Sequence, residues 1–344
     1  MNVHRKPTMN DVAKLAGVGT MTVSRVLNGS ATVSEEATAR VQAAIEQLDY
    51  RPNEMARALR GQRTRSIGLI LPYLYDSFFA MCGHAVTTVA RQHGYSVIMT
   101  TSNEDPDTEY AEAMQMVQRH VEGLVVIPAN RGRTRLNRAL LGKTPLVALD
   151  RPSADPAFDS VLVENHSGSK RMVQHLIEHG HKSIAFMGLS RGVYTINARF
   201  QGYRKAMAEA GLETDACFEC ETMEATVAAI ASRLKQKTPP TAYFTSNTLA
   251  TRFVFAALLQ LGVRIPADAA LAGFDDFELA DLTSPPLTVV RQPVEEMGRA
   301  AAEQLFERLE RGETSEAGKR IVLPVELVLR RSCGCKNKTA VVLR

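Results

Sequence analysis

The stretch TMNDVAKLAGVGTMTVSRVLNG, residues 8–29, spaces its apolar side chains as two short helices divided by the Gly-Val-Gly of 17–19. The apolar positions are Val12, Leu15 and Ala16 in the first helix and Val23, Val26 and Leu27 in the second. A third helix follows in SEEATARVQAAIEQLDY, residues 34–50, before Pro52 ends it. The expected N-terminal caps are Thr8 or Asn10, then Gly19, then Ser34. Three short helices with a tight turn between the first two predict a helix-turn-helix module.

The net positive charge of the chain is confined to its first fifth. Residues 1–65 hold ten basic and six acidic side chains, whereas the remaining residues hold 31 of each, because the whole chain has 41 basic and 37 acidic side chains. Four of the arginines fall within 57–65. This concentration of positive charge predicts a polyanionic partner, and the polar, cationic face of the second helix is its expected contact.

From Ser66 onward, near-continuous apolar strands alternate with amphipathic helices. The expected strands are 66–72, 95–101, 123–128, 145–150, 160–164, 183–189, 241–246 and 269–276. Strands of this kind predict doubly wound parallel sheets covered by helices. The strands SIGLILP (66–72) and SIAFMGL (183–189) each begin a similar unit. We therefore expect two related α/β lobes, with a ligand cleft at the carboxyl ends of their strands.

The five cysteines predict neither a disulfide framework nor a metal site. An odd number of cysteines without an export signal is typical of reduced thiols. Four of them form the sequences CFEC (217–220) and CGC (333–335), for which we expect free thiols because no histidine pattern accompanies them. The sequence HLIEH (175–179) matches one zinc-peptidase pattern, but Gly180 marks it as a helix end, where His179 complements the helix dipole.

Enzyme and membrane functions find no support in the sequence. No nucleophile or acid–base pair stands in a recognisable motif, and the GKT of 142–144 has Asn137 where a phosphate-binding loop requires glycine. The start of the chain lacks the apolar run of a secretory signal, and no segment approaches the ~18 consecutive apolar residues of a membrane span. We therefore expect a cytoplasmic protein that is not an enzyme and uses no cofactor.

The N-terminal stretch, continued by VSEEATARVQAAIEQLDYRPNEMARALRG (33–61), closely resembles the lac-repressor family of bacterial transcription regulators. The likeness continues in HLIEHGHKSIAFMG (175–188), LGVRIPADAALAGFDD (261–276) and PPLTVVRQP (285–293). It implies a helix-turn-helix headpiece over 1–52, a hinge helix over 53–65, a two-lobed sensor similar to periplasmic binding proteins over 66–332, and a tail at 333–344. The implied lobes are about 66–164 with 293–321, and about 165–292 with 322–332. The resemblance further implies a homodimer on palindromic operator DNA.

The resemblance assigns the second helix to the major groove of that DNA. Thr20, Met21 and Arg25 would read base edges, because an arginine can donate two hydrogen bonds to guanine and a methionine suits the methyl group of thymine. Thr22 and Ser24 suit phosphate oxygens or packing. The other implied DNA contacts are Asn28, Asn53, Ala56, Leu59 and Arg60, with Leu59 as a wedge that enters the minor groove.

In the cleft, the resemblance implies an effector site of polar side chains with an aromatic cover. Its members are Asp76, Phe78, Phe79, Asp150, Thr195, Arg199, Asn247, Asp275 and Gln292. Carboxylates, amides and an arginine fork bind hydroxyl groups, and an aromatic ring covers the apolar face of a sugar. One departure from the family pattern is Thr248, where many relatives carry aspartate.

These features predict a repressor of carbohydrate-utilisation genes that is controlled by a sugar, sugar acid or sugar phosphate. A regulator that senses a purine or nucleoside is the alternative within the class, because the adjacent Phe78 and Phe79 permit base stacking. A sugar-binding transport receptor is the alternative from another class, because the two lobes alone would fit it. Such a receptor requires an export signal, which the sequence lacks, and has no use for residues 1–65. We expect no metal and no membrane partner.

Overall fold

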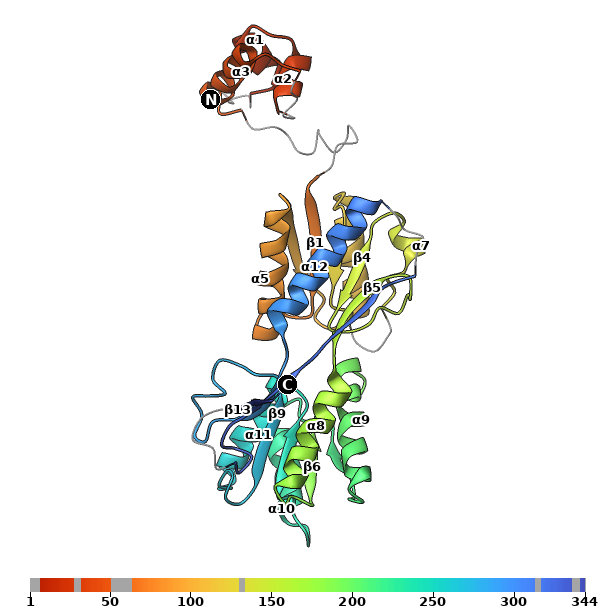
Figure 1. Cartoon of the computed structure of the whole chain (residues 1–344), viewed down its shortest axis with the longest axis vertical. Helices are drawn as coiled ribbons and strands as arrows, with labels where there is room; N and C mark the ends of the chain where they lie inside the picture. The colour runs from red at the N-terminus through yellow and green to blue at the C-terminus, as the bar shows by residue number, and fades with distance from the viewer. Residues whose placement is uncertain are drawn as a thin grey trace. The chain divides into compact units, whose positions relative to one another are not determined.

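The computed structural model of the chain describes residues 7–27, 32–50, 64–129, 134–312, 317–335 and 341–343. They belong to two compact units, Met1–Thr64 and Arg65–Arg344, which we describe separately. The first unit is all-α and the second is α/β (Figure 1), as the sequence predicts. None of the helices in these ranges combines the length and the apolar character that a membrane span requires.

The described part of the first unit consists of short helices that share one small core. They are α1 (Met9–Ala16), α2 (Thr20–Leu27) and α3 (Glu35–Gln47). Each helix contributes a fully buried valine, namely Val12, Val23 and Val41. Gly17 ends α1 with a φ of +64°, a left-handed conformation that glycine adopts without strain, and the chain turns there into α2. The predicted helix-turn-helix is confirmed.

Side-chain caps fix the starts of α1 and α3. In a capping box, the Thr8 backbone amide donates to an Asp11 carboxylate oxygen at 2.7 Å, and the Asp11 amide donates to the Thr8 hydroxyl oxygen at 3.4 Å. Ser34 caps α3 by accepting a hydrogen bond from a backbone amide at 3.3 Å. Of the apolar positions in the first helix, Val12 and Ala16 are buried, whereas Leu15 is 46% exposed.

In the second unit, the described residues form a first sheet of six strands in the order β11-β5-β4-β3-β1-β2, and its paired strands are parallel. The strands are β1 (Ser66–Leu71), β2 (Ser96–Thr101), β3 (Leu124–Val126), β4 (Leu146–Leu149), β5 (Asp159–Val163) and β11 (Arg320–Leu323). The helices of this lobe are α5 (Ser77–Gln92), α6 (Pro106–Gln118), α7 (Arg138–Leu141) and α12 (Val294–Arg311). Helix α12 packs against α5 and β4, so a helix from late in the chain completes the first lobe.

A second sheet, of seven strands within the described ranges, has the order β13-β12-β10-β9-β8-β6-β7. The strands are β6 (Ile184–Met187), β7 (Asp215–Cys217), β8 (Ala242–Thr245), β9 (Ala270–Phe274), β10 (Thr288–Arg291), β12 (Glu326–Leu329) and β13 (Val341–Leu343). The helices are α8 (Asn165–Glu178), α9 (Tyr194–Glu209), α10 (Met223–Leu234) and α11 (Thr248–Gln260). Strand β12 pairs antiparallel with both β10 and β13, whereas the other paired strands are parallel. The sheet is therefore mixed at one edge.

The chain crosses between the lobes from β5 to α8, from β10 to α12 and from β11 to β12 (Figure 1). Strand β11 runs to Leu323, two residues beyond the lobe boundary that the family resemblance implied. The segment expected as a tail also joins the fold, because Cys333 is fully buried and β13 pairs with β12. The sequence prediction missed β7, β10, β11, β12 and β13, each of which is only three or four residues long.

Candidate functional site

One side of α2 is exposed and carries the side chains that we expect to face DNA. The exposed side chains are Thr20, Met21 and Arg25, and the half-buried ones are Thr22 and Ser24. Met21 is 69% exposed, whereas Val23 on the other side of the helix is fully buried. The helix is thus anchored by one face and presents an apolar and a cationic group on the other, which suits contact with base edges in a major groove.

The remaining predicted DNA contacts lie outside the described residues. They are Asn28, Asn53, Ala56, Leu59 and Arg60. Their roles, including that of the minor-groove wedge, stay predictions that rest on the family resemblance.

In the second unit, Arg199 of α9 is the centre of a buried polar cluster. Its Nε donates to Asn165 Oδ1 at 2.8 Å, and its Nη1 donates to the backbone carbonyl oxygen of Ser246 at 2.8 Å. The same Nη1 lies 3.4 Å from Asp275 Oδ2. The guanidinium carbon lies 3.7 Å from the ring centre of Phe274. Residues from α8, α9 and the ends of β8 and β9 thus meet at one side chain.

Asp275 and Asp150 follow directly after β9 and β4. Both have left-handed backbone conformations, with φ of +78° and +66°, which cost free energy for any residue other than glycine. Neighbouring strands hold them there, because their amides donate to the carbonyl oxygens of Val290 and Val161, each at 2.9 Å. Gln292 Nε2 donates to Asp275 Oδ1 at 2.5 Å. Strained backbone at the ends of strands is typical of binding and catalytic sites.

The carboxyl group of Asp150 is almost fully buried. Burial raises its pKa to about 6, although the positive charges of Arg151 and Arg199 oppose the rise. Arg151 Nε lies 3.4 Å from Asp150 Oδ2, but its Nη1 and Nη2 donate to Glu104, each at 2.7 Å. At neutral pH, Asp150 is therefore a buried anion whose charge is only partly compensated, and the hydroxyl groups of a ligand can supply the missing hydrogen bonds.

The first helix of the sensor supplies Asp76 and two phenylalanines. Asp76 caps α5 by accepting a hydrogen bond from the amide of Phe78 at 3.0 Å, and burial raises the pKa of this carboxyl. Phe78 lines a cavity of about 860 Å³ along α5 and the start of α12, together with Asp275 and Gln292 of the predicted site. The other predicted effector residues, among them Asp150 and Arg199, do not line this cavity. Phe79 is only 8% exposed and packs in the hydrophobic core. Phe78 is therefore the ring that a ligand can contact, and core packing accounts for Phe79.

Two further predicted residues lie at the starts of helices. Thr195 is buried one turn before Arg199 on α9, so both side chains lie on the same helix face. Asn247 caps α11, where its Oδ1 accepts a hydrogen bond from the amide of Ala250 at 3.0 Å, so this oxygen already has a structural role. Thr248, the departure from the family pattern, is the half-buried first residue of α11.

The sequence prediction missed four polar residues of this cluster. They are Glu104, Arg151, Asn165 and Ser246, each within three residues of the end of a strand. That position is the signal by which they can be found, because the carboxyl ends of parallel strands meet at one edge of a sheet. Seven buried side-chain atoms of the described residues have no hydrogen-bond partner, and Ser246 Oγ and Gln292 Oε1 are the two beside Arg199 and Asp275. Buried polar atoms normally have one, so both atoms favour a bound ligand.

Comparison with known proteins assigns different families to the two parts of the chain. Residues 8–53 match the family model of bacterial regulatory proteins, lacI family. Residues 173–333 match the model of a periplasmic binding protein-like domain. Both matches agree with the all-α and α/β units described above.

Relatives of known function cover nearly the whole chain. The HTH-type transcriptional repressor PurR of Aliivibrio salmonicida is 32% identical over 314 residues, which are 88% of this chain and 92% of the relative. The ribose operon repressor of Haemophilus influenzae is 32% identical over 328 residues, which are 94% of this chain and 98% of the relative. A crystal structure of the lac repressor dimer, bound to operator and the anti-inducer ONPF, is 25% identical, with a TM-score of 0.84 over 96% of this chain and 99% of that chain.

Proposed function

Since the chain belongs to the lacI family of bacterial regulatory proteins, we propose that it represses carbohydrate-utilisation genes and that a sugar or sugar derivative controls its binding to operator DNA. As a member of this family, it is a DNA-binding transcription regulator and not an enzyme. We place its action in the cytoplasm, on a palindromic operator that a homodimer binds.

The exposed face of α2 supports the DNA-binding half of the proposal. Val23 packs in the core of the headpiece and fixes the orientation of α2, which leaves Met21 and Arg25 exposed on the opposite side. An arginine that donates two hydrogen bonds to a guanine discriminates against other bases by about 1–3 kcal/mol.

The buried cluster around Arg199 carries the effector half of the proposal. The cluster combines the guanidinium of Arg199 with the carboxylate of Asp275 and the amide of Gln292, which are joined by hydrogen bonds. Polyols bind to such alternating donors and acceptors, and the strained backbone of Asp275 and Asp150 holds the carboxylates in place before a ligand arrives. A sugar is therefore the ligand class that this cluster favours.

A purine or nucleoside is the second candidate effector. Phe78 is half-buried and lines the cavity next to Asp275 and Gln292, so a flat base has a ring to stack on and amide and carboxylate partners at its edge. This aromatic contact is the observation that favours a purine or nucleoside, although the same ring can also cover the apolar face of a sugar.

A thermal-shift screen tests the effector half. The full-length protein is melted with sugars, sugar acids, sugar phosphates, purines and nucleosides, because a ligand that binds only the folded state raises the melting temperature. We expect the largest rise from a sugar or sugar derivative. A rise confined to purines or nucleosides would replace the proposal by the second candidate, and no rise from any of these compounds would contradict both.

DNA selection tests the other half. A pool of random duplexes is enriched on the full-length protein, and the selected operator is titrated beside a random duplex at one salt concentration. We expect a palindromic operator, and Arg25→Ala should weaken its binding by about 1–3 kcal/mol while the random duplex changes less. Equal losses on both duplexes would contradict a base-reading role for this arginine.

Apolar side chains on the second unit support the homodimer. Met81 of α5 and the loop residues Leu279 and Leu282 are 40%, 57% and 76% exposed, and large apolar side chains at the surface often mark association faces. Light scattering of the full-length protein should give the mass of two chains, and a monomer at working concentration would contradict this part of the proposal.

A further inference from the structure

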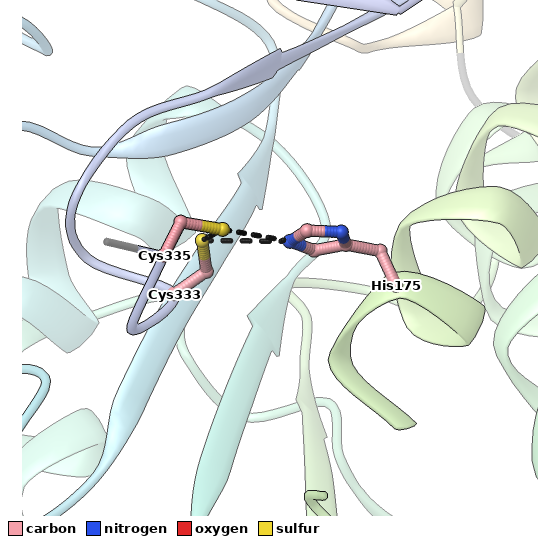
Figure 2. A group of neighbouring side chains, drawn as sticks. All are labelled: His175, Cys333 and Cys335. Atoms are coloured by element: carbon pink, nitrogen blue, oxygen red, sulfur yellow. Dashed lines mark hydrogen bonds between the residues drawn. The ribbon is translucent and has the colours of Figure 1, made fainter. Parts of the chain in front are cut away.

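The second lobe contains a cluster of soft metal ligands that DNA and effector binding do not use. Figure 2 shows the sulfur atoms of Cys333 and Cys335 directed at the ring of His175. His175 Nε2 lies 3.5 Å from Cys333 Sγ and 3.3 Å from Cys335 Sγ. His179 Nε2 lies 3.4 Å from Cys335 Sγ. Two imidazole nitrogens at the end of α8 thus meet two thiols that follow β12. His175 and Cys333 are 158 residues apart along the chain.

These separations agree with those around a tetrahedral zinc ion. Zn–S bonds of about 2.3 Å and Zn–N bonds of about 2.0 Å place a sulfur and a nitrogen about 3.5 Å apart, and two sulfurs about 3.8 Å apart. Three sulfur–nitrogen distances, of 3.3 to 3.5 Å, already match. The ligand atoms of His175, Cys333 and Cys335 all lie within 4.8 Å of one another, whereas the exposed His179, in contact with Cys335, would have to turn toward Cys333 to complete the shell. The two sulfurs are 2.8 Å apart, so ion binding would separate them by about 1 Å. Gly334 lies between the cysteines with a φ of +85°, and its conformational freedom allows this adjustment.

Hydrogen bonds orient the ligand atoms as metal sites require. His179 Nδ1 lies 2.9 Å from the carbonyl oxygen of His175, so Nδ1 donates its proton there and Nε2 turns its lone pair toward Cys335. The hydroxyl of Thr288 donates to Cys333 Sγ at 3.2 Å, which stabilises a thiolate. His175 and His179 are four residues apart on one face at the end of α8.

We propose that the second lobe binds one Zn²⁺ through His175, His179, Cys333 and Cys335. Four protein ligands complete a tetrahedral shell, which is typical of a structural rather than a catalytic ion. Such an ion would tie the C-terminal segment to α8. From the sequence, free thiols are expected here because no histidine pattern accompanies the CGC, and His179 is expected to complement the helix dipole. The fold brings these two stretches of sequence together.

Metal analysis of the full-length protein tests the site. The reduced protein is stripped with a chelator, loaded with Zn²⁺ alone, freed of excess metal and analysed for zinc by mass spectrometry. We expect about one zinc per chain and a melting temperature that rises on loading and falls again with chelator. Loading with Co²⁺ instead should give the charge-transfer absorption of a thiolate-bound cobalt ion.

Two variants remove ligands that lie near the surface. His179 is exposed and Cys335 is half-buried, so His179→Gln and Cys335→Ser should fold and lower zinc affinity more than about tenfold. Two controls keep the ligand set: His166→Gln changes an exposed histidine on the same helix, and Cys217→Ser changes a thiol elsewhere in the lobe. Both controls should retain zinc like the parent protein.

The site is overturned if the reduced parent protein retains no zinc. Equal zinc retention in His179→Gln, Cys335→Ser and the controls also overturns it, as does a cobalt complex without thiolate absorption. A Cys333–Cys335 disulfide that persists in reducing buffer and prevents zinc uptake would likewise replace the metal site by a redox pair.

Discussion

At Arg199, a single guanidinium joins several segments of the chain and also faces the proposed effector site. It binds Asn165, Ser246 and Asp275, and removal of the charge would leave Asp275 as a buried anion without its partner. Breaking a buried ion pair in this way costs about 3–5 kcal/mol. Lysine retains the positive charge beside Asp275 but not the planar fork of donors, so it avoids the cost of an unpaired buried carboxylate while removing the guanidinium's hydrogen bonds.

We predict that Arg199→Lys lowers effector affinity by about 10- to 100-fold, because hydrogen bonds to charged groups contribute about 1.5–3 kcal/mol. The melting temperature should fall as well, because lysine cannot replace all the hydrogen bonds to Asn165 and Ser246, and each buried group left without a partner costs about 1–3 kcal/mol. Calorimetric titration with the compound that the thermal-shift screen identifies measures the affinity. Arg204→Lys, at an exposed position on the same helix, should bind like the parent. Unchanged affinity in Arg199→Lys would remove this arginine from the site.

The buried carboxyl of Asp150 predicts a dependence of stability on pH. Its pKa is about 6 in the folded protein and about 3.9 in an unfolded chain, so the folded state binds more protons between these values. Stability contributed by this group therefore falls as pH rises from about 4 to about 6, and a penalty of roughly 3 kcal/mol is complete above that window.

We predict that Asp150→Asn is more stable than the parent at pH 7.5 and that the gain shrinks as the pH falls toward 5, because the neutral amide carries no buried charge. Urea unfolding at both pH values measures the difference. Asp107→Asn, on the exposed start of α6, should show neither the gain nor its pH dependence. A stability difference independent of pH would contradict a buried, ionised Asp150.

Among the elements, α8 and α9 depend on one glycine for their close packing. A methyl group at Gly202 of α9 would overlap the backbone carbonyl oxygen of His166 and press against Ser169, both on α8. The same two helices carry Asn165 and Arg199, whose hydrogen bond supports the polar cluster. The distance between the helices therefore bears on both stability and the effector site.

We predict that Gly202→Ala destabilises the protein by about 1–3 kcal/mol, because α9 must move away from α8, and that it also weakens effector binding. Thermal and urea melts measure the stability. The control is Lys205→Ala, an exposed change on the same helix, which should stay within about 0.5 kcal/mol of the parent. Parent-like stability in Gly202→Ala would show that the packing tolerates the extra carbon.

On the scale of the whole molecule, function is divided between the two compact units. The fragment from Arg65 onward contains both sheets and the polar cluster, whereas the net positive charge and the exposed face of α2 lie in the first unit or at its boundary. Contacts between cationic side chains and phosphates release counterions, so DNA binding by the full chain should weaken steeply as salt rises.

We predict that a fragment of residues 65–344 melts cooperatively and binds the effector like the full chain but does not bind the selected operator. Thermal shift measures the first property and duplex titration the second. The full chain, titrated at several salt concentrations, is the reference and should show the steep salt dependence. Operator binding by the fragment would contradict the division of function.

The sequence alone determined the features that depend on interactions between residues close together along the chain. Apolar spacing, Thr8, Gly17 and Ser34 define the headpiece helices, because periodicity and capping are local interactions. Long apolar runs likewise define the central strands, and the polar residues that follow them include much of the proposed effector site. The very short strands from β10 to β13 contain too few residues to show a recognisable pattern, so only their pairing with neighbouring strands in the folded sheet identifies them.

Only the tertiary structure decided which of these residues meet. The order of the strands brings Asn165, Arg199 and Asp275 together, and core packing rather than residue type separates Phe79 from Phe78. The meeting of His175 with the C-terminal cysteines depends on contacts between segments 158 residues apart. No local pattern encodes such a contact, because its geometry follows from how the helices and the sheet pack around a shared core.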